Sequence, residues 1–181
     1  MTLYKNELMQ TNKLFSKKFF VIALILFSAL LLAGCTQTNS DTNGPTFSGE
    51  INTFSFVNNN LCTENGKPVI RMFSTTWCSH CGWIKDTFDS TVKEYVDSGK
   101  IVAYHWELDT GNNTLTDVAE TNVPESEQSI FTQFSPNGSV PVFVFGCQYY
   151  RIGNGYEKTS DLVSEEGEFR AVIEKLIAEQ K

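Results

Sequence analysis

Two apolar runs separated by a helical pattern constrain the fold of this chain more than any other feature. Residues 68–73, PVIRMF, form a short apolar run led by proline, and residues 101–108, IVAYHWEL, form a second run of β-favouring composition. Between the two runs, apolar residues recur at the spacing of one helix face, at Ile84, Phe88, Val92, Tyr95 and Val96. We therefore expect two parallel strands joined by a crossover helix.

The second half of the chain adds further elements to this unit. A short helix is expected over residues 124–134, and a strand over residues 140–146, VPVFVFG, which Pro141 opens. Residues 148–157 continue past a bend as the expected hairpin partner of that strand. An amphipathic helix near the C-terminus is marked by Phe169, Val172, Ile173, Leu176 and Ile177. This order predicts an α/β fold with a central mixed sheet covered by helices on both faces.

The first 34 residues differ in kind from the rest of the chain. Lys13, Lys17 and Lys18 form a basic patch, and residues 19–33 are apolar apart from one serine. A basic patch followed by an apolar stretch of this length is typical of a signal peptide, whereas a membrane-spanning helix needs about 20 residues. An apolar leader that is kept as an uncleaved membrane anchor stays open as the alternative.

The apolar stretch ends in the tetrapeptide LAGC, residues 32–35. It resembles the lipobox of prokaryotic lipoproteins, in which a peptidase cuts after small residues and the cysteine thiol receives the lipid. The resemblance implies that residues 1–34 are removed and that Cys35 becomes the lipidated N-terminus. The lipid would hold the protein on the extracytoplasmic face of the cell membrane, with residues 35–50 as a flexible linker and residues 51–181 as the folded domain.

The charge of the chain after residue 34 argues against nucleic acid as a partner. The sequence holds 14 Lys and Arg and 21 Asp and Glu, of which four basic residues and one acidic residue lie in residues 1–34. The remaining 10 basic and 20 acidic residues give a net charge of −10. A domain this acidic repels phosphate backbones, so we expect no binding to nucleic acid.

Two cysteines, Cys78 and Cys81, stand where the first expected strand passes into the helix. A helix N-terminus favours a thiolate, because its free backbone N–H groups and its dipole are positive there. We expect the pKa of Cys78 to lie below the free-thiol value of about 8.5. Cys81, one turn inside, stays protonated longer, and His80 between them favours the Cys78 thiolate further. In this interpretation Cys78 is the nucleophile and Cys81 resolves the mixed disulfide.

At these residues the chain resembles the thioredoxin family. Residues 75–81, TTWCSHC, match the family's strand–WCxxC–helix arrangement, and Val140-Pro141 before VFVF matches its cis-proline loop. The resemblance covers residues 60–180 and implies a thioredoxin-like fold, in which Trp77 shapes the surface and Val140 and Pro141 dock the substrate. It implies disulfide exchange with protein thiols without a cofactor, and a membrane electron donor or acceptor as redox partner.

The chain also departs from the family. The Cys-x-His-Cys pattern and the valine before proline are closer to DsbA-like oxidants, but only 31 residues separate Leu108 from Val140, which leaves no room for the DsbA-like helical insertion. Many relatives carry a buried carboxylate where this chain has Met72. His105 and Glu107 are the titratable groups left for its role, although a solvent-facing strand or a hydrogen-bonded histidine explains them more simply. The direction of electron flow stays open.

Metal binding is the main alternative use of the motif. Cys78, His80 and Cys81 offer soft ligands for copper or zinc, as in a metallochaperone, and a non-catalytic binding module is a further alternative. A closed zinc site takes four ligands, yet the chain has two histidines and no second CxxC. A purely structural disulfide across two residues would restrain the unfolded chain little. We therefore expect redox chemistry and no metal.

With Cys35 lipidated, Cys62 and Cys147 remain beside the CxxC pair, and an exported chain with four cysteines permits two disulfides. In a thioredoxin-like sheet, the strand before CxxC and the strand after the cis-proline are antiparallel neighbours. Cys62 precedes the first and Cys147 follows the second, so both lie at the sheet end opposite the CxxC. The turn at residues 64–67, ENGK, folds Cys62 back toward that end. We predict a Cys62–Cys147 disulfide, with two buried free thiols as the alternative.

Overall fold

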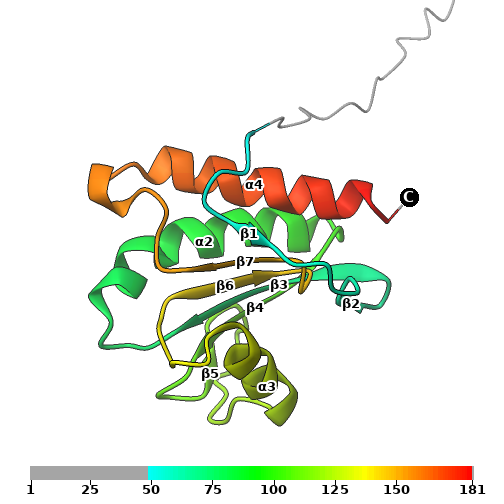
Figure 1. Ribbon diagram of the computed structural model, residues 1–181. Helices are drawn as coiled ribbons and strands as arrows, with labels where there is room; N and C mark the ends of the chain where they lie inside the picture. The colour runs from blue at the N-terminus through cyan, green and yellow to red at the C-terminus, as the bar shows by residue number, and fades with distance from the viewer. Residues whose placement is uncertain (1–48, 181) are drawn as a thin grey trace, which may run out of the picture. The chain divides into compact units, whose positions relative to one another are not determined.

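Strand β3 (Lys67–Ser74) lies in the middle of a mixed sheet. The computed structural model describes residues 49–180, and within them seven strands are arranged in the order β1-β7-β6-β3-β4-β5, with β2 paired to β3 (Figure 1). The other strands are β1 (Ser55–Phe56), β2 (Thr63–Glu64), β4 (Val102–Glu107), β5 (Asn112–Asn113), β6 (Val142–Phe145) and β7 (Tyr149–Ile152).

Several sequence predictions concern residues outside the described range. The leader 1–34, the lipidation of Cys35 and nearly all of the linker 35–50 belong to this group. Within residues 49–180, no helix is long and apolar enough to cross a bilayer.

The predicted strand–helix–strand unit is confirmed. β3 and β4 pair in parallel from Val69↔Val102 to Ser74↔Glu107, and helix α2 (Ser79–Asp97) connects them. α2 ends where Gly99 adopts a positive φ of 71° and donates its N–H to the Val96 carbonyl at 2.8 Å.

The second half of the sheet is antiparallel, as expected. β6 pairs with β3 from Ile70↔Phe145 to Phe73↔Val142, and β7 returns beside β6. The turn between β6 and β7 needs a glycine at position 146, where φ is 60° and a Cβ would lie 2.6 Å from Leu61 Cδ1.

Helices cover both faces of the sheet. α2 and α4 (Leu162–Ala178) lie on one face, and α3 (Glu125–Phe134) lies on the other (Figure 1). The sheet separates two cores. Successive side chains of the central strands point to opposite faces and so contribute alternately to one core and the other. The α2/α4 side buries Ile70, Met72, Phe88, Phe143, Phe145 and Phe169. The α3 side buries Phe73, Trp106, Phe134, Val142 and Val144.

A buried charge cluster fastens the start of the described chain to α4. The Arg151 guanidinium contacts Glu165 at 2.5 Å and Glu168 at 3.4 Å, and the three side chains are 0–4% exposed. Glu168 in turn accepts hydrogen bonds from the backbone N–H groups of Asn52 and Thr53. These contacts fix residues 52–53 against the helix. They also give each buried charge of the cluster a partner in place of water.

Candidate active site

The CxxC pair lies where the central strand passes into α2. Cys78 is the N-cap of α2, with φ −80° and ψ 110°, and Cys81 lies in its first turn. The two cysteines form a disulfide with a Cα–Cα distance of 5.2 Å. The Cys81 N–H points at Cys78 Sγ, 3.2 Å away. This is the position that the sequence predicted, and in the reduced protein the same N–H would donate to a Cys78 thiolate.

The loop before β6 faces this disulfide. The Val140-Pro141 peptide bond is cis, and the Val140 carbonyl oxygen lies 3.9 Å from Cys78 Sγ. The Pro141 carbonyl accepts a hydrogen bond of 2.8 Å from the Gly153 N–H, which ties this loop to the segment after β7. The start of α2 and the Val140-Pro141 loop, 62 residues apart in sequence, therefore meet at Cys78.

The surface beside the pair carries an exposed aromatic side chain. Trp77 is 76% exposed, whereas Cys78 and Cys81 are only 8% and 3% exposed. The turn that holds Trp77 is fixed by Asp109, whose carboxylate accepts from the Thr76 N–H at 3.0 Å and from the Thr76 hydroxyl. The hydrogen bond from the Thr76 side chain lowers the pKa of Asp109. No local sequence pattern marks Asp109 as part of the site.

His80 is held by two residues of the loop between β7 and α4. Its Nδ1 lies 2.8 and 2.9 Å from the two carboxylate oxygens of Glu157, which begins the short 3₁₀ helix η1 (Glu157–Thr159). Asn154 Nδ2 donates to the His80 carbonyl and to Glu157, both at 2.9 Å. Burial works against the ionisation of Glu157, but hydrogen bonds from Asn154 and His80 together lower its pKa. Neither Asn154 nor Glu157 was singled out from the sequence.

His105 is a buried, fully engaged histidine. It pairs in register with the core residue Met72, and both are 0% exposed. His105 Nδ1 lies 2.6 Å from Asp89 Oδ1, and its Nε2 lies 2.8 Å from Ser74 Oγ. The simpler explanation, a hydrogen-bonded histidine, therefore holds for this residue. Glu107, on the same strand, accepts from Lys85 Nζ at 3.2 Å.

The other two cysteines of the described chain form the predicted second disulfide. Cys62 and Cys147 are 85 residues apart in sequence, and their Cα atoms are 5.4 Å apart. The Cys62 N–H donates to the Gly146 carbonyl at 2.9 Å, so the segment before β3 lies against the turn after β6. A tight turn with positive φ at Asn65 and Gly66 brings the chain back into β3. This bridge closes the sheet end opposite Cys78.

Metal binding was the alternative use of the CxxC motif. Within residues 49–180, no group of three or more His, Cys, Asp or Glu side chains is placed to hold a metal ion. Cys78 and Cys81 are bonded to each other, and His80 Nδ1 faces the Glu157 carboxylate.

Comparisons with known proteins assign no family to this chain. No protein-family model matches the sequence, and no curated protein matches it.

Proposed function

We propose that this protein is a thioredoxin-like thiol–disulfide oxidoreductase that exchanges disulfides with protein substrates through Cys78 and Cys81. One observation carries the proposal: the CxxC disulfide caps α2 while the cis Val140-Pro141 loop faces it, with the Val140 carbonyl 3.9 Å from Cys78 Sγ. A bridge placed only for stability needs neither a helix N-terminus nor a facing loop.

The arrangement of the sheet supports a thioredoxin-like fold. A parallel pair, β3 and β4, is joined by α2, and the antiparallel hairpin β6–β7 follows on the other side of β3. α4 then packs with α2 on one face of the sheet (Figure 1). In this fold the dithiol lies at the carboxyl end of the central strand, which is where Cys78 follows β3.

The reaction consists of two exchange steps. In the reducing direction, the Cys78 thiolate attacks one sulfur of a substrate disulfide. A Cys78–substrate disulfide forms and the substrate bond breaks, so that one substrate thiolate leaves and takes up a proton. The Cys81 thiolate then attacks Cys78 Sγ and releases the second substrate thiol. Two electrons pass to the substrate, and the Cys78–Cys81 disulfide remains; oxidation of a substrate dithiol is the reverse sequence.

The residues around the pair have distinct roles in these steps. The Cys81 N–H and the α2 terminus stabilise negative charge on Cys78 Sγ. Trp77 offers an exposed apolar surface to a protein substrate, and the Val140-Pro141 loop lies where the substrate backbone would pair. Cys78 is more exposed than Cys81, at 8% against 3%, which favours Cys78 for the attack on a second protein and Cys81 for the resolving step.

The cellular setting follows from residues outside the described range. A Cys35 lipid would keep the domain at the extracytoplasmic membrane face, near a membrane donor or acceptor of electrons. Mass spectrometry of protein extracted from membranes tests this: we expect loss of residues 1–34 and a lipid mass on Cys35. A Cys35→Ser protein that remains in the membrane with the same processing would contradict it.

Trapping of the mixed disulfide tests the reaction itself. A Cys81→Ala protein should accumulate a covalent adduct through Cys78 with a disulfide-containing substrate such as insulin, because the resolving thiol is missing. A Cys78→Ala protein should form none. If wild-type protein neither reduces insulin nor oxidises a reduced protein substrate, and Cys81→Ala traps nothing, the proposed function is wrong.

A further inference from the structure

The loop between β7 and α4 contacts the CxxC segment from a distant part of the sequence. Glu157 places both carboxylate oxygens within 2.9 Å of His80 Nδ1, across a sequence separation of 77 residues. Asn154 adds a hydrogen bond to the His80 carbonyl. The ring and the backbone of His80, which directly precedes Cys81, are therefore both held by one loop.

This loop is itself built onto the buried charge cluster. The Arg151 Nε donates to the Gly153 carbonyl at 3.1 Å, and Glu165 accepts from the Tyr156 N–H at 2.8 Å. Arg151 and Glu165 are 5% and 0% exposed, so the loop is held from the core on either side of Asn154. The position of Glu157 is therefore fixed by the fold.

The hydrogen bond between His80 and Glu157 determines which ring nitrogen of His80 carries a proton. An ionised carboxylate can only accept, so Nδ1 must carry a proton and donate it to Glu157. Nε2 is then the nitrogen left for other partners. A protonated ring that is paired with Glu157 forms a neutral pair, whereas an unpaired protonated ring would be a full positive charge beside Cys78.

We propose that Glu157 is a positioning residue that sets the reduction potential of the Cys78–Cys81 pair through His80. This inference deepens the function proposed above and rests on it for its biological meaning. A positive His80 favours the Cys78 thiolate and thus the reduced pair, which makes the disulfide a stronger oxidant. Glu157 offsets that charge and orients the ring through its hydrogen bond with Nδ1, so the disulfide is a weaker oxidant than its CxHC sequence alone implies.

The test replaces only the charge. In Glu157→Gln the side chain keeps its length and one accepting oxygen, and the equilibrium of Cys78–Cys81 with glutathione is measured by alkylation and mass spectrometry. The buffer is held at about pH 6, near the ordinary imidazole pKa of about 6.5, for every variant. We expect the equilibrium constant with glutathione to move toward the reduced protein by about three- to fivefold, the upper part of the range for an exposed ion pair.

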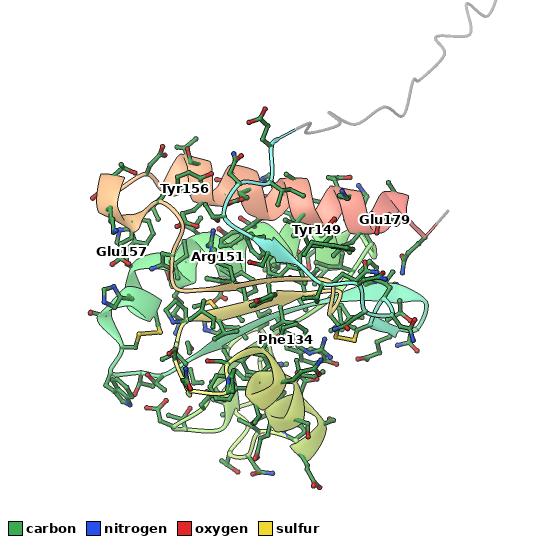
Figure 2. All side chains as sticks on the ribbon, in the orientation of Figure 1. Phe134, Tyr149, Arg151, Tyr156, Glu157 and Glu179 are labelled. Carbon is green, nitrogen blue, oxygen red and sulfur yellow. A yellow bond between two sulfur atoms is a disulfide. The ribbon has the colours of Figure 1, made fainter. Side chains whose placement is uncertain are left out.

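Three matched variants make the result specific. Glu157→Asp retains the charge and should stay within about twofold of wild type. Glu179→Gln removes the same charge near the opposite end of α4 from Glu157 and should leave the constant unchanged (Figure 2). In a His80→Ala protein, the Glu157→Gln exchange should move the constant by less than about twofold, because its route through the ring is gone.

Two results would overturn the inference. The first is an equilibrium constant with glutathione that does not change in Glu157→Gln. The second is an equal change with and without His80, which would mean that the Glu157 charge acts directly on the Cys78 sulfur. The measurement is made on the cysteine pair itself. Failure of the proposed function would instead appear as a normal glutathione equilibrium with no exchange toward protein substrates.

Discussion

The backbone N–H of Cys81 lies 3.2 Å from Cys78 Sγ, across the first turn of α2. This contact makes the two sulfurs unequal although they belong to one motif. Cys78 sits at the positive end of the helix and receives a hydrogen bond, whereas Cys81 lies inside the first turn with 3% exposure. The asymmetry supports the proposed division into an attacking and a resolving thiol.

The first prediction concerns this asymmetry. In the reduced protein, Cys78 should react with an alkylating agent at a lower pH than Cys81, because the thiolate is the reacting species and the helix terminus favours it at Cys78. Peptide mapping after brief alkylation over a series of pH values measures both rates. Equal rates, or faster modification of Cys81, would remove the case for Cys78 as the nucleophile.

The second prediction concerns the Cys62–Cys147 bridge, whose cysteines are 85 residues apart. Replacing both by alanine should lower the free energy of unfolding by about 4–5 kcal/mol in the chain-entropy model, because the unfolded chain regains the freedom of a long loop. Denaturant unfolding measures the loss. Disulfide exchange by the folded double variant should continue, since the bridge lies at the sheet end opposite Cys78. A loss below about 1 kcal/mol would contradict a stabilising bridge.

The sequence predicts the long elements because their signals are local. β3 and β6 are continuous apolar runs that are buried on both faces, and α2 carries an apolar pattern on the one face it buries. The bounds of the three elements differ from the expected ones by a few residues. The two-residue strands β1, β2 and β5 carry no such pattern. β1 exists only because a distant strand offers a hydrogen-bonding edge, since Ser55 and Phe56 pair with β7. β2 and β5 are short pairings beside a turn, with β3 and β4 respectively.

The candidate site was predictable only where its residues belong to a local sequence pattern. Short motifs predict Cys78, Cys81 and Pro141. Glu157 contacts His80 across 77 residues in a polar loop, and no local pattern marks it. Arg151 is just as hidden, because a charged side chain in a strand pattern predicts exposure, whereas it is 5% exposed beneath α4.

The third prediction is a pH dependence that arises from Tyr104. Burial, with a hydrogen bond to Glu64, raises the pKa of this phenol to about 12. The folded state therefore holds the proton more tightly than the unfolded chain, whose tyrosines titrate at about 10. The resulting stabilisation is fully present below about pH 10 and is lost as the pH rises toward about 12.

Ultraviolet titration of the tyrosines measures this effect. The phenolate absorbance of the folded protein should include a component near pH 12, to which Tyr95 also contributes, because burial raises its pKa to about 12 as well. Tyr104→Phe should reduce that late component, and Glu64→Gln should move the Tyr104 titration to lower pH. Tyr104 titrating with the ordinary residues would show that its ring is not shielded.

The last prediction concerns the buried cluster of Arg151, Glu165 and Glu168. Burial lowers the pKa of Arg151, while the neighbouring Glu165 opposes that shift. Replacing Arg151 by methionine keeps much of the packing against Phe54, Phe143 and Phe169 but leaves two buried carboxylates without their counter-charge. We expect the free energy of unfolding to fall by about 3–5 kcal/mol, the range for breaking a buried ion pair on one side.

A matched exchange on the surface separates burial from charge. Arg170 lies on α4, the helix that also carries Glu165 and Glu168. It pairs with Glu94 and Glu166, and its side chain is 21% exposed. Arg170→Met should therefore cost about 1 kcal/mol or less, because exposed ion pairs are weak. Adding Glu165→Gln and Glu168→Gln to Arg151→Met should restore part of the loss by removing the unpaired charges. Equal losses for Arg151→Met and Arg170→Met, measured by denaturant unfolding, would show that burial of the cluster contributes nothing specific to stability.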